Sequence, residues 1–139
     1  MAIWQADYAV APPGGELPED YRALLDQVLP RADSWADDLE IWGVDDGDRI
    51  DVVHCGAREY EMFARFDLRN WRPDLYDRFL AFVRGTGATL HVAPLDAGGP
   101  QIDLTHEAFQ ASLLASNAFR FVLDPEAYLR SLPRQRREP

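Results

Sequence analysis

The residues of this sequence that could carry out chemistry are three histidines, one cysteine and a run of carboxylates. His54 and Cys55 are adjacent, and a cysteine nucleophile with a histidine base needs its two side chains to hydrogen-bond. Neighbouring residues on a strand point to opposite faces, so these two cannot readily do so. We expect His54 to lie at a strand end and Cys55 to be a buried thiol, because free cysteine is among the most buried residue types.

The carboxylates gather in the stretch DSWADDLEIWGVDDGDRID, residues 33–51, which contains seven Asp, one Glu, one Arg and two Trp. Calcium binds oxygen-rich turns, but this run lacks the twelve-residue spacing and the terminal Glu of an EF-hand loop. Its Asp-Gly pair instead has the composition of a tight hairpin. No two histidines have the i, i+4 spacing of a helical metal site, and no glycine loop has the spacing of a phosphate or dinucleotide motif. We therefore predict no catalytic residue, no metal and no cofactor.

The composition indicates one folded domain. A chain of 139 residues with 47% hydrophobic and 12% aromatic residues is long enough to bury a single core. We assign residues 1–132 to one α+β domain and residues 133–139 to a flexible basic tail. Neither a signal-peptide pattern nor a long apolar run is present, and a single cysteine fits a reducing compartment, so we expect a cytoplasmic protein. All 14 basic residues are Arg, which indicates a bacterium of high GC content.

The negative charge is concentrated in the first half of the chain. Residues 1–60 contain fourteen acidic residues against four Arg, a net charge of −10, whereas residues 61–139 contain ten of each and are neutral. An acidic face repels nucleic acid and anionic membranes, and it speeds encounter with a basic partner. We therefore expect no binding to nucleic acid or membrane, and we expect a basic protein partner.

Hydrophobic periodicity predicts the secondary structure. Alternation marks the strands, apolar stripes at i, i+3, i+4 and i+7 mark the helices, and Pro, Asp and Gly mark helix boundaries. The predicted elements are a strand at 3–11, a helix at 18–29, strands at 39–44, 49–55 and 59–69, a helix at 73–85 capped by Gly85, a strand at 88–95, a helix at 105–115 and a helix starting at Asp124.

This order, β-α-β-β-β-α-β-α-α, predicts an α+β fold. We expect a ferredoxin-like sandwich, with an antiparallel or mixed sheet of about five strands and two helices on one face. The C-terminal helices are expected to cover an edge or part of the second face, because the segment FQASLLASNAFRFVL is too apolar to remain in water.

Two features of the central strands could form a binding surface. In residues 59–69 one face is apolar, and the other alternates charges around Phe63, as on an open sheet face. The acidic stretch adds two Trp, and interfaces favour aromatic and Arg anchors. Strict alternation sets Trp42 opposite Leu39 and Ile41, so its exposure depends on which face is buried. The predicted partner-binding residues are Trp35, Asp37, Asp38, Glu40, Trp42, Asp45, Asp46, Asp48, Phe63, Arg65, Asp67 and Arg69.

The same residues allow a purely structural interpretation. The acids could do no more than solvate a hairpin, the tryptophans could belong to the core, and the strand charges could pair with one another on a wet sheet face.

A small acidic α+β chain with Trp35 and Trp42 at its surface, and with the strand ARFDLR set against DDLEIWGVDDGD, resembles the immunity proteins of bacterial toxin systems. The likeness lies in size, charge and arrangement. It implies an inhibitor that neutralises a basic toxin by tight binding, rather than an enzyme. We expect a monomer or a homodimer.

Two other functions fit the same sequence. A small enzyme or ligand-binding domain would have a pocket between the open sheet face and the C-terminal helices, lined by His54, His91, Arg65 and Arg69. A subunit of a homo-oligomer would bury its surface aromatics against its own copies. Histidines that converge in a cleft would indicate an enzyme, whereas tryptophans on a flat acidic surface would indicate a binder.

Overall fold

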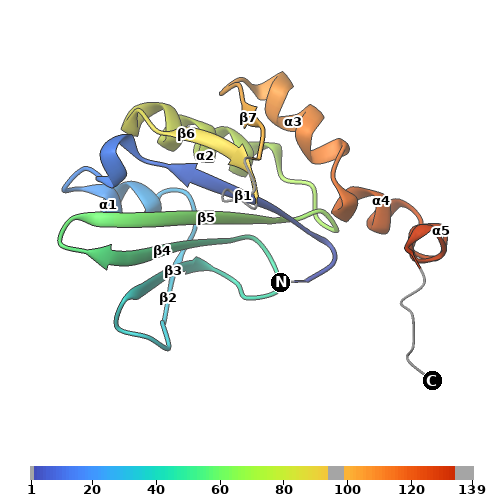
Figure 1. The fold of residues 1–139 in the computed structure, drawn as a ribbon, viewed down its shortest axis with the longest axis horizontal. Coiled ribbons are helices and arrows are strands. Elements are labelled where there is room, and N and C mark those ends of the chain that lie inside the picture. Colours follow the sequence, from blue (N-terminus) through green and yellow to red (C-terminus); the bar gives the residue numbers. More distant parts are fainter. Residues whose placement is uncertain (1, 94–98, 134–139) are drawn as a thin grey trace.

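The computed structural model describes residues 2–93 and 99–133, in which seven strands form one antiparallel sheet (Figure 1). The strands lie in the order β2-β3-β4-β5-β1-β6-β7. Their bounds are β1 Gln5–Ala11, β2 Arg31–Ala32, β3 Leu39–Gly43, β4 Arg49–Gly56, β5 Glu59–Asp67, β6 Thr89–Val92 and β7 Gln101–Ile102. The first strand of the chain pairs with β5 on one side and β6 on the other, so it joins the β2–β5 part of the sheet to the β6–β7 hairpin.

The helices leave one face of the sheet open. Their bounds are η1 Pro13–Gly15, α1 Tyr21–Asp26, α2 Pro73–Thr86, α3 His106–Leu114, α4 Asn117–Leu123 and α5 Pro125–Ser131. The first three α-helices pack on the same face, because Leu25, Phe79 and Phe109 belong to one buried core with the sheet. The last two extend from α3 at one end of the molecule (Figure 1). We call the sheet face opposite α1, α2 and α3 the free face.

Phe66 on β5 is the centre of the core. Its ring centroid lies 6.0 Å from that of Tyr8, 5.5 Å from that of Tyr76, 5.0 Å from that of Phe79 and 5.5 Å from that of Phe109. These rings come from β1, α2 and α3, so one side chain joins the sheet to both helices. Edge-to-face contacts of this kind stabilise a core beyond the burial of area alone.

The predicted α+β class and the antiparallel pairing are confirmed. The alternation predicted for residues 59–69 is also observed: Met62, Ala64 and Phe66 are buried in the core, while Phe63 and Arg65 lie on the free face. The hairpin predicted at the Asp-Gly pair joins β3 to β4.

The strand number differs from the prediction, and of the two places predicted for the C-terminal helices α3 takes the edge, against β7, rather than the second face. Among the described residues the sheet has seven strands instead of about five, because β2 and β7 have two residues each and are too short to show a period. The helix α3 lies beside α2 and does not cover the second face, since Phe109 packs on Tyr8 from the core side. The ferredoxin-like outline is therefore matched only roughly.

Several element boundaries also differ. The first helix begins at Tyr21, after a turn, instead of at residue 18. The helix α2 continues past Gly85 to Thr86 and is capped by Gly87, whose φ of 72° is the left-handed conformation of a C-cap. Ser116 caps α4, a separate helix that the sequence did not predict. Residues 94 and 95 of the predicted strand, and residues 134–139 of the predicted tail, lie outside the described residues.

The core defined by α1 and α2 is testable by truncation. Leu25→Ala and Phe79→Ala each remove a fully buried side chain, and each should lower the free energy of unfolding by about 2 to 5 kcal/mol. Chemical denaturation measures this loss. Val44→Ala, at a residue that is 61% exposed, is the control and should change stability by less than about 0.5 kcal/mol. Losses as small as the control at both core sites would show that these helices do not form the core.

Candidate functional site

A row of charged side chains crosses the free face. Asp7 on β1 is paired in register with Arg65 on β5, and Arg65 with Arg49 on β4. The distance between Arg65 Nε and Asp7 Oδ1 is 3.5 Å. Burial raises the pKa of Asp7, and the nearby Arg65 guanidinium offsets this only in part. Asp7 and Arg65 therefore pair across strands, whereas Arg49 pairs with Asp51 along its own strand.

The next row along the free face is less polar. It runs from Ala9 on β1 through Phe63 on β5 and Asp51 on β4 to Ile41 on β3. A hollow of about 740 Å³ lies over β1 and β5, with Ala9, Phe63 and Arg65 among its lining residues. The free face thus combines a half-buried aromatic ring with paired charges.

The segment between β2 and β3, residues 33–38, carries an exposed tryptophan. We call it the acidic loop, because Asp33, Asp37 and Asp38 are all exposed in it. The side chain of Trp35 is 73% exposed, and its ring lies 5.1 Å from the guanidinium carbon of Arg49. This contact places the acidic loop next to the free face.

Arg49 is itself held firmly beneath that ring. It is only 3% exposed, its Nε donates to Asp51 Oδ1 at 2.6 Å, and its Nη1 donates to the Asp45 carboxylate. Charge-assisted hydrogen bonds of this kind restrain a guanidinium strongly. Trp35 is therefore supported in its exposed position by a cation–π contact with an ordered arginine.

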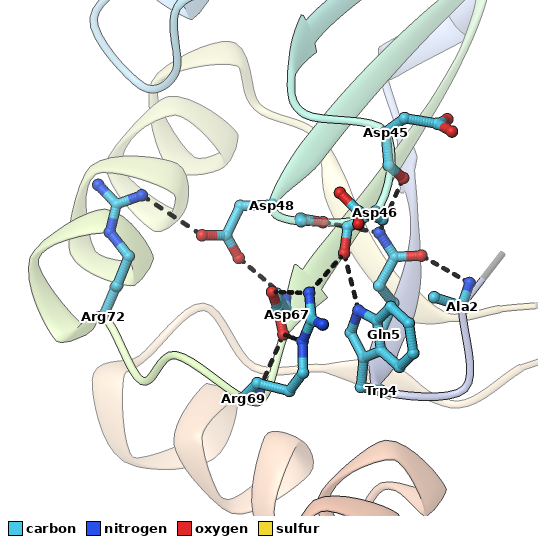
Figure 2. Close-up of polar contacts among 10 residues, drawn as sticks. Ala2, Trp4, Gln5, Asp45, Asp46, Asp48, Asp67, Arg69 and Arg72 are labelled. Carbon is cyan, nitrogen blue, oxygen red and sulfur yellow. Dashed lines mark hydrogen bonds and ion pairs between the residues drawn. The ribbon is translucent and has the colours of Figure 1, made fainter.

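The tip of the β3–β4 hairpin is held through its main chain (Figure 2). Trp4 Nε1 donates to the carbonyl of Asp46 at 2.7 Å. Gln5 Nε2 donates to the carbonyls of Asp45 at 3.2 Å and Gly47 at 2.7 Å. The side chains of Trp4 and Gln5 thus bind the main chain of the tip. The carboxylates of Asp45 and Asp46 point away from them and are exposed.

Asp48 at the same tip has a structural role. Its carboxylate accepts a hydrogen bond from the main-chain N–H of Asp67 at 2.8 Å and lies 3.4 Å from Arg72 Nη1. Arg69 donates to the Asp67 carboxylate at 2.9 Å and to the Asp46 carbonyl at 3.2 Å, as Figure 2 shows. The hairpin tip is therefore joined to the end of β5 through buried carboxylates.

Glu40 on β3 connects several elements on the helix-bearing face. It accepts hydrogen bonds from Arg22 Nε at 2.5 Å, from Arg31 Nη2 at 2.7 Å and from the Tyr21 hydroxyl. His54 Nε2 lies 2.7 Å from the same carboxylate. These partners come from α1, β2 and β4, so one carboxylate links three elements to β3.

This environment keeps Glu40 ionised. Burial alone would raise the pKa of its carboxyl, but the hydrogen bonds from Arg22, Tyr21 and His54 outweigh burial and lower the pKa to about 2. A carboxylate whose oxygens already accept this many bonds has little capacity left for a partner. Glu40 is a structural residue of the described chain.

The two tryptophans of the acidic stretch, residues 33–51, differ in their exposure to solvent. Trp35 is exposed, whereas Trp42 is fully buried and donates from Nε1 to Asp26 Oδ1 at 2.8 Å. The prediction that Trp42 binds a partner is wrong, because Leu39 and Ile41 lie on the free face and set Trp42 toward the helices.

The other predicted binding residues divide into three groups. Exposed in the acidic loop or at the hairpin tip are Trp35, Asp37, Asp38, Asp45 and Asp46. On the free face are Phe63 and Arg65. Occupied in internal contacts are Glu40, Asp48, Asp67 and Arg69, so these four have a structural role, and their binding role stays a prediction.

The histidines of the alternative enzyme pocket do not converge. His54 points to the helix-bearing face, where it meets Glu40. His91 lies on the free face of β6, with Nε2 2.9 Å from Thr89 Oγ1. Two strands separate β4 from β6, and within residues 2–93 and 99–133 no three His, Cys, Asp or Glu residues form a group that could hold a metal ion.

Cys55 is exposed, so its predicted burial is wrong. It is the last residue but one of β4, next to Gly56 and within the register shift between His54 and Gly56. The thiol is therefore open to reagents in the folded protein.

Sequence reasoning missed the partners that hold these residues in place. Sequence reasoning does not select Arg49 and Asp7 as site residues, because their part in the site depends on which residues the strand register brings together. One signal was available for Glu40: it shares its side of the strand with Trp42, and a charge on a buried side requires donors from neighbouring elements.

A scan against protein-family models, a search of curated proteins and a search of solved structures each found no match to this chain. In the part of the chain that the structure describes, each helix is too short or too polar to pass through a membrane. Geometry and charge therefore carry the functional proposal.

The role of Glu40 predicts a pH dependence of stability. Its pKa is lowered from 4.5 to about 2, so its contribution is complete above about pH 4.5 and is lost as the pH falls toward 2. Glu40→Gln should lower the free energy of unfolding by about 3 kcal/mol at pH 7, and the difference from wild type should shrink on acidification. Urea titrations between pH 2 and 7 measure this.

Glu59→Gln is the matched control, because Glu59 is an exposed glutamate at the start of β5 in the same sheet. It should leave the stability curve nearly unchanged. A Glu40→Gln deficit that stays constant down to pH 2 would contradict the lowered pKa.

Proposed function

We propose that this chain is a small acidic protein-binding domain that holds a basic protein partner with its acidic loop and the adjoining free face. The acidic loop supplies Trp35 and three exposed aspartates. The free face supplies Phe63 and Arg65 around a hollow. The charge of −10 carried by residues 1–60 favours a basic partner over nucleic acid or an anionic membrane.

The exposure of Trp35 is the observation that carries this proposal. Proteins usually bury much of a tryptophan, yet this ring remains 73% exposed while it stacks on the ordered guanidinium of Arg49. A ring that is already positioned loses little conformational freedom on binding. Tryptophan is also enriched among the residues that dominate binding energy at interfaces.

The specific function that we propose is that of an immunity protein, which neutralises a basic bacterial toxin in the cytoplasm by tight binding. The small size, the acidity and the exposed aromatic anchor support this function. The placement of His54 and His91 on opposite faces of the sheet favours binding over catalysis. The carboxylates of the acidic loop would draw a basic toxin toward Trp35 over about a Debye length, roughly 8 Å at physiological salt.

The test begins with the products of neighbouring genes. Each basic product is expressed in a host cell with and without this protein, and growth is measured. One product should inhibit growth alone and be neutralised by co-expression, and the two purified proteins should form a complex. If no neighbouring product is toxic, or if a toxic one is neither bound nor neutralised, the immunity function is excluded.

The acidic loop predicts two separable kinetic effects on that complex. Replacing Asp33, Asp37 and Asp38 by Asn should lower the association rate by roughly three- to tenfold at low salt and flatten its salt dependence. Trp35→Ala should mainly raise the dissociation rate, by roughly 30-fold for a central anchor. Surface plasmon resonance at several salt concentrations resolves both rates.

Matched controls distinguish these effects from general ones. Glu16→Gln, Glu19→Gln and Asp20→Asn together remove the same number of exposed charges from another loop, and they should alter association much less. Leu123→Ala removes a side chain that is also 73% exposed but lies on α4, and it should leave dissociation unchanged. Kinetics that respond equally to variants and controls would refute a specific role of the acidic loop.

A further inference from the structure

The carboxylate of Asp7, on the free face, has few hydrogen-bond donors around it. Its side chain is 22% exposed, and its Oδ1 is enclosed without a hydrogen-bond partner among residues 2–93 and 99–133. Arg65 Nε lies 3.5 Å from this oxygen, so the two groups attract each other without a well-formed hydrogen bond. Enclosed carboxylate oxygens normally accept hydrogen bonds, and an exception calls for an explanation.

A comparison with Glu40 shows what Asp7 lacks. Burial works against the charge of Glu40 as well, but hydrogen bonds from three neighbouring side chains bring its pKa down to about 2. Burial raises the pKa of Asp7, because the attraction of Arg65 offsets it only in part. Asp7 therefore has the capacity to accept hydrogen bonds from a group outside the described part of the chain.

The hollow over β1 and β5 has a net negative charge. Its charged lining residues are Asp7, Glu61 and Arg65, two acids and one Arg, which gives a net charge of −1. The two strands lie side by side in the sheet (Figure 1), and Glu61 is exposed on β5. Arg65 opposes a second cation in the hollow, but the two acids outweigh it. The hollow therefore attracts a cation and disfavours an anion.

Phe63 supplies an aromatic surface in the same hollow. It follows Glu61 by two residues on β5, and it is paired in register with Ala9, two residues after Asp7 on β1. The side chain of Ala9 is a single methyl group, which leaves room beside the ring. A planar guanidinium can stack on such a ring and also bind a carboxylate through parallel hydrogen bonds. The ammonium group of lysine has no such planar surface, so the hollow fits arginine best.

We propose that the hollow binds an arginine side chain of the basic protein partner, whose guanidinium lies against the ring of Phe63 and donates to the carboxylate of Asp7. Glu61 adds attraction from the same strand as the ring. The contact between Trp35 and Arg49 already shows this pairing of ring and guanidinium on the free face. The inference rests on the proposed function, because it names the group with which that partner would enter the free face.

A short peptide tests the hollow without the toxin. The probe is acetyl-Gly-Arg-Gly-amide, titrated into the isotope-labelled full chain and followed by NMR at neutral pH and low salt. Saturable shifts should appear at the main-chain signals of Asp7, Ala9, Glu61 and Phe63. The same peptide with citrulline, which has the shape of arginine without its charge, should bind at least about tenfold more weakly. Equal binding of the two peptides, or no shifts at the hollow, would overturn the proposal.

Variants of the hollow locate the contact. Asp7→Asn keeps the shape of the side chain and should raise the dissociation constant of the peptide about tenfold. Because burial disfavours the charge of Asp7, this variant should melt at or above the wild-type temperature, so lost binding would not reflect unfolding. Phe63→Leu keeps an apolar side chain without the ring and should weaken binding about threefold.

Asp33→Asn is the matched control, because it makes the same change at an exposed residue of the acidic loop. It should bind the peptide like the wild type. A loss as large as that of Asp7→Asn would show that general attraction holds the peptide, which overturns the proposal.

These outcomes are distinct from those of the growth test. Peptide binding in the hollow without any toxic neighbouring product would exclude the immunity function and support the arginine site. A toxin that is bound and neutralised equally well by the Asp7→Asn variant would overturn the arginine site alone.

Discussion

The contact of Phe66 with four other aromatic rings is the interaction on which the rest of this structure depends. It draws β1, β5, α2 and α3 together on one side of the sheet. Because the buried aromatic rings lie on that side, the helices of residues 2–93 and 99–133 that form the core pack there, and the opposite side presents Phe63 and Arg65 outward. The free face is therefore open because the aromatic side chains lie on the other side of the sheet. A binding surface on the free face requires no structural feature beyond this arrangement.

The acidic stretch divides its carboxylates between two tasks. Glu40 and Asp48 are buried and bind α1, β2 and the end of β5 to the β3–β4 hairpin, where unpaired charges would be costly. Asp37 and Asp38 are exposed, and their carboxylates add only to the negative electrostatic potential around the molecule. Two further carboxylates of the same stretch, those of Asp45 and Asp51, hold Arg49 beneath Trp35.

The class of fold could be predicted from sequence, because strands such as 59–69 and helices such as α2 carry clear periods of two and 3.6 residues. The strands β2 and β7 could not be predicted, because two residues are too few to show a period. They pair only because the neighbouring strands β3 and β6 have open edges. At the candidate site, composition marked the acidic stretch as unusual. It could not separate exposed Trp35 from buried Trp42, because that depends on which side of β3 faces the helices. The pairing of Arg65 with Asp7 depends on register between strands far apart in sequence, which composition does not contain.

The short outer strands have a consequence for how this protein meets other chains. A sheet edge binds an added strand through a row of free N–H and C=O groups, and β2 and β7 offer rows of only two residues. Strand addition there would form few main-chain hydrogen bonds, which also limits edge-to-edge aggregation. The proposed partner would then have to be recognised by side chains on loops, helices and the free face. A surface of that kind can change its choice of partner by a few substitutions while the sheet beneath it stays the same.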